Sequence, residues 1–274
     1  MTHVLTIARL ECVTAARLKW VRLLTAAFAL LAGAAAYSVG AGNELSGADG
    51  FARTTMALIP MALLLIPLAA VVLGVCGQSA EPGSEPFLFA QPVGRMSVLV
   101  GRWMGEVAAL SGSVVIGFGI GGAVVVLANG PADLLSFAFF VGASVLLGAI
   151  FLSIAAAIAS TTDKRVTALG IGIFIWFVFV LLYDGAALSL AGWLTGSVGG
   201  RVLFASVLGN PVDLIRVAML LVSGTPHVLG AAGDAWTRFL GGSVHAAVIA
   251  AGALMLWTVV PLAGAIRVIG RRDL

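Results

Sequence analysis

The strongest constraint on the fold is a series of apolar stretches, each about 20 residues long, with almost no charged side chain. About 20 residues of α-helix cross the roughly 30 Å hydrocarbon core of a bilayer. Only 10% of the 274 residues are charged, against about 25% in soluble domains. The sequence predicts an all-α integral membrane protein, with one transmembrane domain over 1–274. Six expected transmembrane helices lie at 21–41, 54–77, 103–128, 134–160, 167–191 and 242–266.

The lysine and arginine residues predict how these spans are oriented. Eleven of the fifteen basic residues fall on one side of the membrane: Arg9, Arg17, Lys19, Arg22, Arg95, Arg102, Lys164, Arg165, Arg267, Arg271 and Arg272. The other side holds Arg53, Arg201, Arg216 and Arg238. Because cytoplasmic loops carry the excess of basic residues, both termini are expected in the cytoplasm.

The N-terminal segment precedes the first span. In residues 3–20, apolar positions alternate with charged ones at helical spacing, which predicts an amphipathic helix along the inner membrane interface. A positively charged flank of the first span explains the same pattern. A cleaved signal peptide is the less favoured alternative, because 22 residues precede the apolar run at Leu23.

A further helix is predicted at 211–222, inside the long connection between the fifth and sixth spans. Asn210 suits the N-cap, Pro211 the first helical position, and Asp213 the first turn, where it opposes the positive end of the helix dipole. Gly224 and Pro226 would end this helix. Its apolar face predicts that it lies on the outer membrane surface or over the bundle of spans.

The motifs argue against an enzyme. The sequence has no G-x-x-x-x-G-K-[ST] loop, so ATP and Mg²⁺ are expected on a separate subunit and no cofactor on this chain. The glycine-rich segment 117–122 lies inside a span, where close helix packing explains it. The formal charge of +3 is too small and scattered to indicate nucleic acid, and Cys12 and Cys76 are too far apart in sequence for a zinc or disulfide motif.

Soft-metal ligands are thinly spread along the chain. Met56 and Met61 are five residues apart, about 140° around a helix, so they are not expected to share a face. No metal site is predicted.

Two acidic residues lie in or near predicted spans. Asp184 is either paired with an arginine of the outer loop or reaching interfacial water, and the sequence leaves both interpretations open. Glu106 is interpreted as an interface residue that reaches cytoplasmic water or Arg102.

Three features resemble the membrane subunits of type-2 ABC exporters, which have six spans and an N-terminal interfacial helix. Ile7-Ala8-Arg9 with Glu11 resembles the family's opening helix. Glu81-x-Gly83-Ser84 with Pro92-x-x-Arg95 resembles its inner loop, and the chain ends in basic residues just past the sixth span. Within that class, segments 176–184 and 210–216 resemble the permeases that serve maturation of the copper sites of nitrous oxide reductase.

The resemblance implies a homodimer in a bacterial or archaeal inner membrane, with a cytoplasmic ABC ATPase and a periplasmic β-helical protein as partners. It implies coupling to the ATPase through two inner loops that contain Glu81, Gly83, Ser84, Pro92, Arg95, Asp163, Lys164 and Arg165. It also implies docking of the outer partner at Asn210, Pro211, Asp213 and Arg216. Two other interpretations are an exporter of another cargo, such as a drug, lipid or peptide, and a channel or structural protein without an ATPase.

Overall fold

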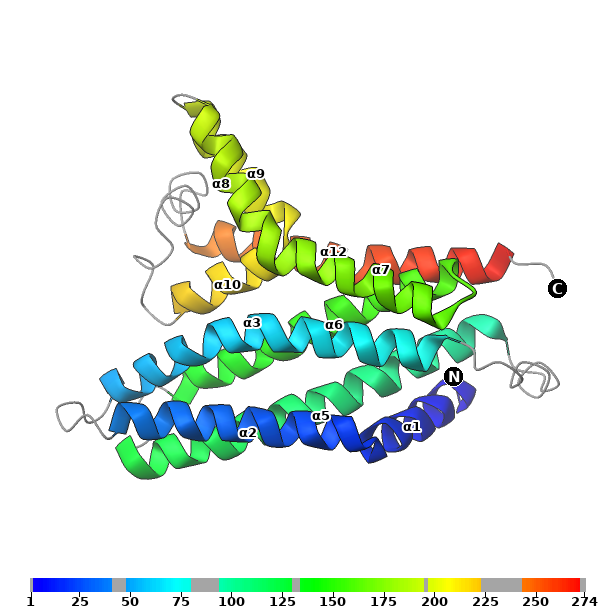
Figure 1. Cartoon of the computed structure of the whole chain (residues 1–274), viewed down its shortest axis with the longest axis horizontal. Helices are drawn as coiled ribbons and strands as arrows, with labels where there is room; N and C mark the ends of the chain where they lie inside the picture. The colour runs from blue at the N-terminus through cyan, green and yellow to red at the C-terminus, as the bar shows by residue number, and fades with distance from the viewer. Residues whose placement is uncertain are drawn as a thin grey trace.

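The computed structural model describes residues 2–40, 48–79, 94–129, 134–194, 197–222 and 243–271, and all regular structure among them is helical. The elements of the first half are α1 (Thr2–Arg17), α2 (Lys19–Gly40), α3 (Ala48–Gln78), α5 (Arg95–Asn129) and α6 (Leu134–Thr161). The second half contains α7 (Arg165–Phe177), the π-helix η1 (Val178–Leu182), α8 (Tyr183–Trp193), α9 (Ser197–Gly209), α10 (Pro211–Val222) and α12 (Ser243–Arg271). Helices α2, α3, α5, α6 and α12 run side by side along the longest axis (Figure 1).

The predicted fold class is confirmed. Five helices among the described residues are long and apolar enough to cross a membrane: 53–78, 96–124, 134–161, 165–193 and 248–271. The remaining predicted span corresponds to α2, which follows α1 across a bend of 66°. Helix α1, the predicted interfacial helix, is a separate helix at an angle to α2 and packs against α5. A second bent pair, α9 and α10, meets at 100°.

Helix α5 begins earlier than the apolar pattern indicates. The predicted span starts at residue 103, whereas the helix starts at Arg95 and has 35 residues, a length of about 52 Å. That length exceeds the roughly 30 Å of hydrocarbon, so the first turns extend beyond the apolar layer. Arg95 and Arg102 therefore belong to this helix and not to a loop between spans. Hydropathy marks only the part of a helix that lies in lipid.

Burial divides the spans into an inner and an outer group. In α3 and α6, 67% of the most apolar window is buried within the chain, and these two helices form the centre of the bundle. The window of α7, η1 and α8 is only 11% buried, and that of α12 is 17% buried. The apolar faces of these outer helices are therefore available to lipid or to another subunit.

Glycines on α5 bring three helices into close contact. A Cβ at Gly101 would lie 2.9 Å from Ile7 of α1, and a Cβ at Gly105 would lie 2.6 Å from the Ala8 carbonyl oxygen. Farther along, a Cβ at Gly121 would lie 1.9 Å from the Cβ of Ala32 on α2. The glycines thus allow α1 and α2 to pack on a single helix, as close packing in membranes requires.

A row of aromatic rings continues this contact into the core. The ring of Phe28 on α2 lies 5.0 Å from that of Phe118 on α5, and Phe118 lies 5.0 Å from Phe140 on α6, all measured between centroids. All three side chains are fully buried. Such tilted ring pairs contribute about 0.5–1.5 kcal/mol beyond the burial of their area.

The close contact at Gly121 predicts a large effect of a single methyl group. We expect Gly121→Ala to lower the free energy of unfolding by about 1–3 kcal/mol, because α2 must move away from α5. Gly119→Ala is the matched control, since a Cβ at Gly119 meets nothing within 4 Å. Thermal unfolding of both variants in the same detergent measures the difference. Equal melting temperatures would contradict the contact.

Candidate functional site

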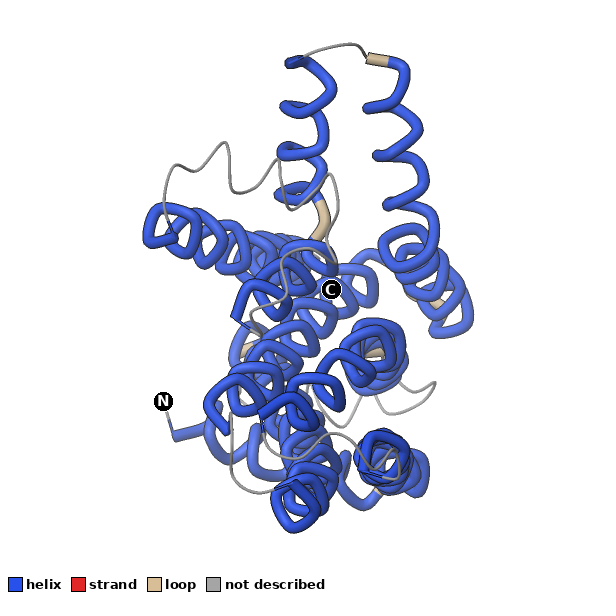
Figure 2. Tube along the Cα trace, turned by 90° about the vertical axis from the view of Figure 1, so that its left-hand side faces the viewer, coloured by secondary structure: helices blue, strands red, loops and turns tan. Residues whose placement is uncertain are grey.

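The most distinctive feature of the fold is a sharp elbow between α9 and α10. The rod formed by α7, η1 and α8 is bent: α7 runs along the bundle, α8 turns away from it, α9 returns beside α8, and the chain then turns into α10 (Figures 1 and 2). Both short helices are under 14 residues long, so neither crosses the bilayer by itself. Together the two helices are long and apolar enough for one span that is bent by 100°, either a broken span or a re-entrant loop, and the turn at Asn210 lies inside the protein.

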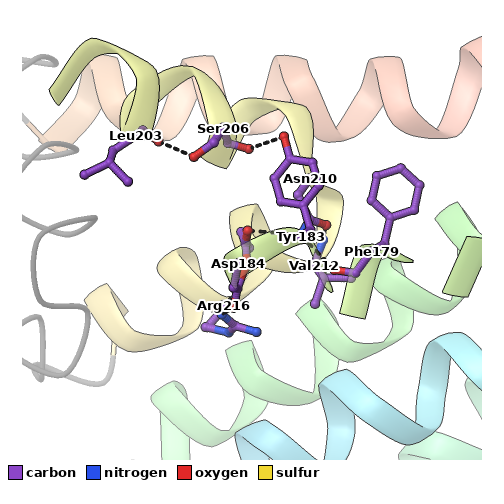
Figure 3. A network of polar contacts seen from close by, with 9 residues as sticks. Phe179, Tyr183, Asp184, Leu203, Ser206, Asn210, Val212 and Arg216 are labelled. Atoms are coloured by element: carbon purple, nitrogen blue, oxygen red, sulfur yellow. Dashed lines mark hydrogen bonds and ion pairs between the residues drawn. The ribbon is translucent and has the colours of Figure 1, made fainter. Parts of the chain in front are cut away.

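Asn210 is fully buried and fixes the elbow with its whole side chain. Its Oδ1 accepts a hydrogen bond from the Val212 amide at 3.0 Å, which confirms the predicted N-cap. Its Nδ2 donates to the Phe179 carbonyl of η1 at 2.9 Å and to Asp213 Oδ2 at 3.0 Å. One amide side chain thus joins the start of α10 to the π-helix (Figure 3).

The carbonyls at the end of α9 are satisfied by side chains from other elements. The Tyr183 hydroxyl donates to the Ser206 carbonyl at 3.0 Å, and Trp257 Nε1 of α12 donates to the Leu208 carbonyl at 3.2 Å. A helix end leaves four carbonyls without partners inside the helix, and in an apolar setting each needs another donor. Phenol and indole groups supply two of these donors.

Charged side chains gather beside the elbow. Arg216 of α10 forms an ion pair with Asp184 of α8 (Figure 3). It forms a second ion pair with Asp213, 3.1 Å from Arg216 NH1 to Asp213 Oδ1. Of the two interpretations of Asp184, the structure supports the pair with an outer arginine. The cluster contains two carboxylates and one guanidinium, so it has an excess of negative charge when both acids are ionised.

The four residues predicted to dock an outer partner lie in this cluster or next to it. Asn210, Pro211 and Asp213 are buried, and Arg216 is half-buried. Helix α10 has the predicted bounds, but it packs against α6 and α12 inside the bundle instead of lying on the outer membrane surface. Docking at these residues stays a prediction, and in this arrangement only Arg216 offers a partly accessible side chain.

A second polar cluster surrounds Glu106 near the start of α5. Glu106 is fully buried and does not reach water. Its Oε2 accepts a hydrogen bond from Gln78 Nε2 at 3.3 Å, and its Oε1 accepts none from the described residues. Its carboxylate lies over Gly77, where a Cβ would be 2.2 Å from Oε1 and 3.5 Å from Glu11 Oε1.

Glu11 of α1, the predicted interfacial helix, lies beside this cluster. Burial raises the pKa of the Glu11 carboxyl, and the nearby charge of Arg102 opposes that rise. Contact between residues 11, 78 and 106 depends on how three separate helices pack. No local motif in the sequence signals it.

The residues predicted to couple to an ATPase are placed only in part. Asp163 and Lys164 are exposed in the short turn between α6 and α7, and Arg165 is the first residue of α7. Arg95 is the first residue of α5. Glu81, Gly83, Ser84 and Pro92 lie outside the described residues.

The described residues offer no arrangement of three or more His, Cys, Asp or Glu side chains that could hold a metal ion. Cys12 and Cys76 are free thiols, each half-buried. Within this part of the chain, the chemistry of the candidate site is that of fixed hydrogen bonds and ion pairs.

Several helices long and apolar enough to cross a membrane, a bent pair fixed by buried polar contacts, and an exposed charged turn define a multi-pass membrane protein. The chain belongs to the ABC-2 family: the family model described as ABC-2 family transporter protein matches residues 5–274. Two relatives are each described as a probable ABC transporter permease protein NosY. One, from Pseudomonas aeruginosa, is 35% identical over 228 residues, and the other, from Stutzerimonas stutzeri, is 31% identical over 227 residues. Both alignments cover 80% of this chain and 82% of the relative.

The hydrogen bonds of Asn210 predict that the elbow depends on this amide. We expect Asn210→Ala to lower the free energy of unfolding by about 2–4 kcal/mol. It removes an N-cap, and it leaves the buried Phe179 carbonyl without this donor.

Ser189→Ala is the control for Asn210→Ala. It removes one exposed hydrogen bond, from the Ser189 hydroxyl to the Gly185 carbonyl on α8, and should leave stability within about 0.5 kcal/mol of the parent protein. Thermal unfolding of both purified variants compares them. The elbow would not depend on Asn210 if the two melting temperatures agreed.

Proposed function

We propose that this chain is the membrane-spanning permease of a NosY-like ABC transporter and supports maturation of the copper sites of nitrous oxide reductase. The observation that carries the proposal is the similarity, over 80% of the chain, to two proteins described as probable NosY permeases. The ABC-2 family implies an ATPase partner, and the absence of a phosphate-binding loop from the sequence fits that division of labour. ATP and Mg²⁺ would bind to that partner.

The proposed assembly has two copies of this chain in the inner membrane, with both termini in the cytoplasm. Two cytoplasmic ATPases of the NosF type and a periplasmic β-helical protein of the NosD type would complete it. The low internal burial of α7, η1, α8 and α12 supports a second copy, because these helices leave apolar faces for another helix to cover.

The proposed mechanism couples ATP-driven motion at the inner turn to the outer elbow. The exposed residues Asp163 and Lys164 join the central helix α6 to α7, which continues through η1 into α8. This continuous rod spans Arg165–Trp193, about 43 Å. A push on the turn would therefore reach Asp184 and the elbow through a single element. The proposed dimer would exist in two arrangements, and nucleotide would shift the equilibrium towards the one that it favours.

Trp176 supports this role of the rod by linking it to the centre of the bundle. Its Nε1 donates to the Leu64 carbonyl of α3 at 3.0 Å, about one turn before Pro67. The π-helix follows two residues later, and such segments occur often at functional sites. We infer that the rod pivots near Trp176, with its inner end on the ATPase and its outer end at the elbow.

Outer docking would involve the hairpin of α8 and α9. This hairpin projects from the bundle (Figure 2), and Leu190 and Trp193 near the end of α8 are 55% and 88% exposed. The proposed β-helical partner would contact the hairpin together with Arg216. The partner would not touch the buried residues Asn210, Pro211 and Asp213 directly. They would transmit its motion to the elbow.

Co-purification tests the assembly. The tagged chain is extracted in mild detergent from its native host grown on nitrous oxide, and the accompanying proteins are identified by mass spectrometry. An ATPase together with a periplasmic β-helical protein is the expected result. An ATPase alone would indicate an exporter of another cargo, such as a drug, lipid or peptide, and neither partner would contradict the proposed assembly.

Charge reversal at the first residue of α5 tests the coupling surface. We expect Arg95→Glu to reduce the amount of co-purified ATPase roughly five- to thirtyfold, which corresponds to about 1–2 kcal/mol of docking free energy. Arg53→Glu is the control. It makes the same charge reversal at an exposed position near the start of α3 and should leave docking unchanged. Quantitative mass spectrometry measures the ratio of the two subunits. Undiminished ATPase with Arg95→Glu would place the coupling surface elsewhere.

A further inference from the structure

A cavity of about 600 Å³ opens beside the elbow, and nothing in the proposed function uses it. Its walls come from α3, η1, α8, α9 and α10, and most of the lining side chains are apolar. Pockets of about 300–1,000 Å³ with an apolar lining and a few polar groups are the usual size and character of small-molecule sites. The cavity is therefore large enough for a compact organic molecule.

The polar part of the lining is the charge cluster of Asp184, Asp213 and Arg216. Arg216 is shared between both carboxylates. Asp213 is only 8% exposed, and its Oδ1, although 3.1 Å from Arg216 NH1, accepts no hydrogen bond from the described residues. When both acids are ionised, two carboxylates facing one guanidinium leave one negative charge unbalanced, which a bound cation would neutralise.

The rim of the cavity indicates that the ligand is apolar as well as cationic. Met61, Leu181 and Leu188 line the cavity and are 44%, 50% and 56% exposed on helices with apolar outer faces. A molecule entering past these side chains crosses an apolar surface before it reaches the carboxylates. A small hydrated metal ion would lose its water at that rim, whereas a cation enclosed in hydrocarbon would not.

The methionines on α3 add to the apolar wall. Met56 and Met61 both line this cavity, from different directions around the helix as their spacing predicts. Pro60 lies between them, inside the helix, where it removes a backbone hydrogen bond. Unbranched, polarizable methionine side chains adapt to ligands of differing shape.

We propose that this cavity binds a lipophilic cation, with its apolar body against α3 and α8 and its positive charge at Asp184 and Asp213. The ligand chemistry is an organic cation shielded by hydrocarbon. It could come from a membrane lipid with an ammonium head group or from a free lipophilic cation. The inference does not depend on the proposed role in copper-site maturation.

Binding of radiolabelled tetraphenylphosphonium to the full chain tests the proposal. The protein is reconstituted in phosphatidylcholine nanodiscs, and binding is measured by scintillation proximity. We expect saturable binding that unlabelled tetraphenylphosphonium displaces and that tetraphenylborate, an anion of nearly the same shape, does not. Absence of saturable binding, or equal competition by the anion, would overturn the proposal.

Three variants locate the site. Met61→Trp fills the cavity without changing charge, and Asp213→Asn removes one carboxylate at nearly constant volume; each should weaken binding at least about tenfold. Met255→Trp places the same indole at a 69% exposed position of α12 that does not line the cavity, and it should bind like the parent protein. Because Asp213→Asn also disturbs the elbow, its melting temperature is measured alongside. If Met61→Trp bound like the parent, the proposal would be wrong even if Asp213→Asn had failed to fold.

The source of the cation is distinguished by native mass spectrometry of the purified protein. A lipid is the occupant if phosphatidylethanolamine co-purifies with the protein, is displaced by tetraphenylphosphonium, and is missing from Met61→Trp. Tetraphenylphosphonium binding without any displaced lipid would identify a site for free cations. If Met61→Trp instead separated a dimer into single chains, a second copy would fill the cavity and the proposal would fail.

Discussion

The structure depends on one constraint: in lipid, each backbone amide and carbonyl must find its partner inside the protein. Continuous spans satisfy it with their own hydrogen bonds. The elbow breaks a helix inside the protein, and there the partners are the side chains of Asn210, Tyr183 and Trp257. These side chains make the buried end of α9 tolerable, and the charge cluster of Asp184, Asp213 and Arg216 and the cavity lie beside it.

Glycines on α5, which have no side chain, determine how closely α1 and α2 pack in this half of the bundle. Helix α5 receives α1 at Gly101 and Gly105 and α2 at Gly121. The interfacial helix and the first span are thus fixed to the same element, and Glu11 reaches the buried Glu106 through this contact. The long helix α5, which begins at the predicted coupling residue Arg95, joins the inner surface to the core.

The features that could be predicted from the sequence are those that residues close together in the chain determine. Apolar length located the spans, and the Asn210-Pro211 cap gave the bounds of α10 because N-cap and proline preferences act within one turn. The sequence did not predict that α10 is buried, because an amphipathic pattern does not distinguish a polar face in water from one paired with Asp184. The burial of Glu106 depends on how separate helices pack, which no local pattern encodes.

The bond from Trp257 to Leu208 also has a consequence for the order of assembly. Helices α9 and α10, with 13 and 12 residues, are too short to be inserted as separate spans during synthesis. One of the groups that satisfies the end of α9 belongs to α12, the last helix of the described chain. The bond that satisfies the Leu208 carbonyl therefore forms only after α12 has been synthesised and has packed beside the elbow.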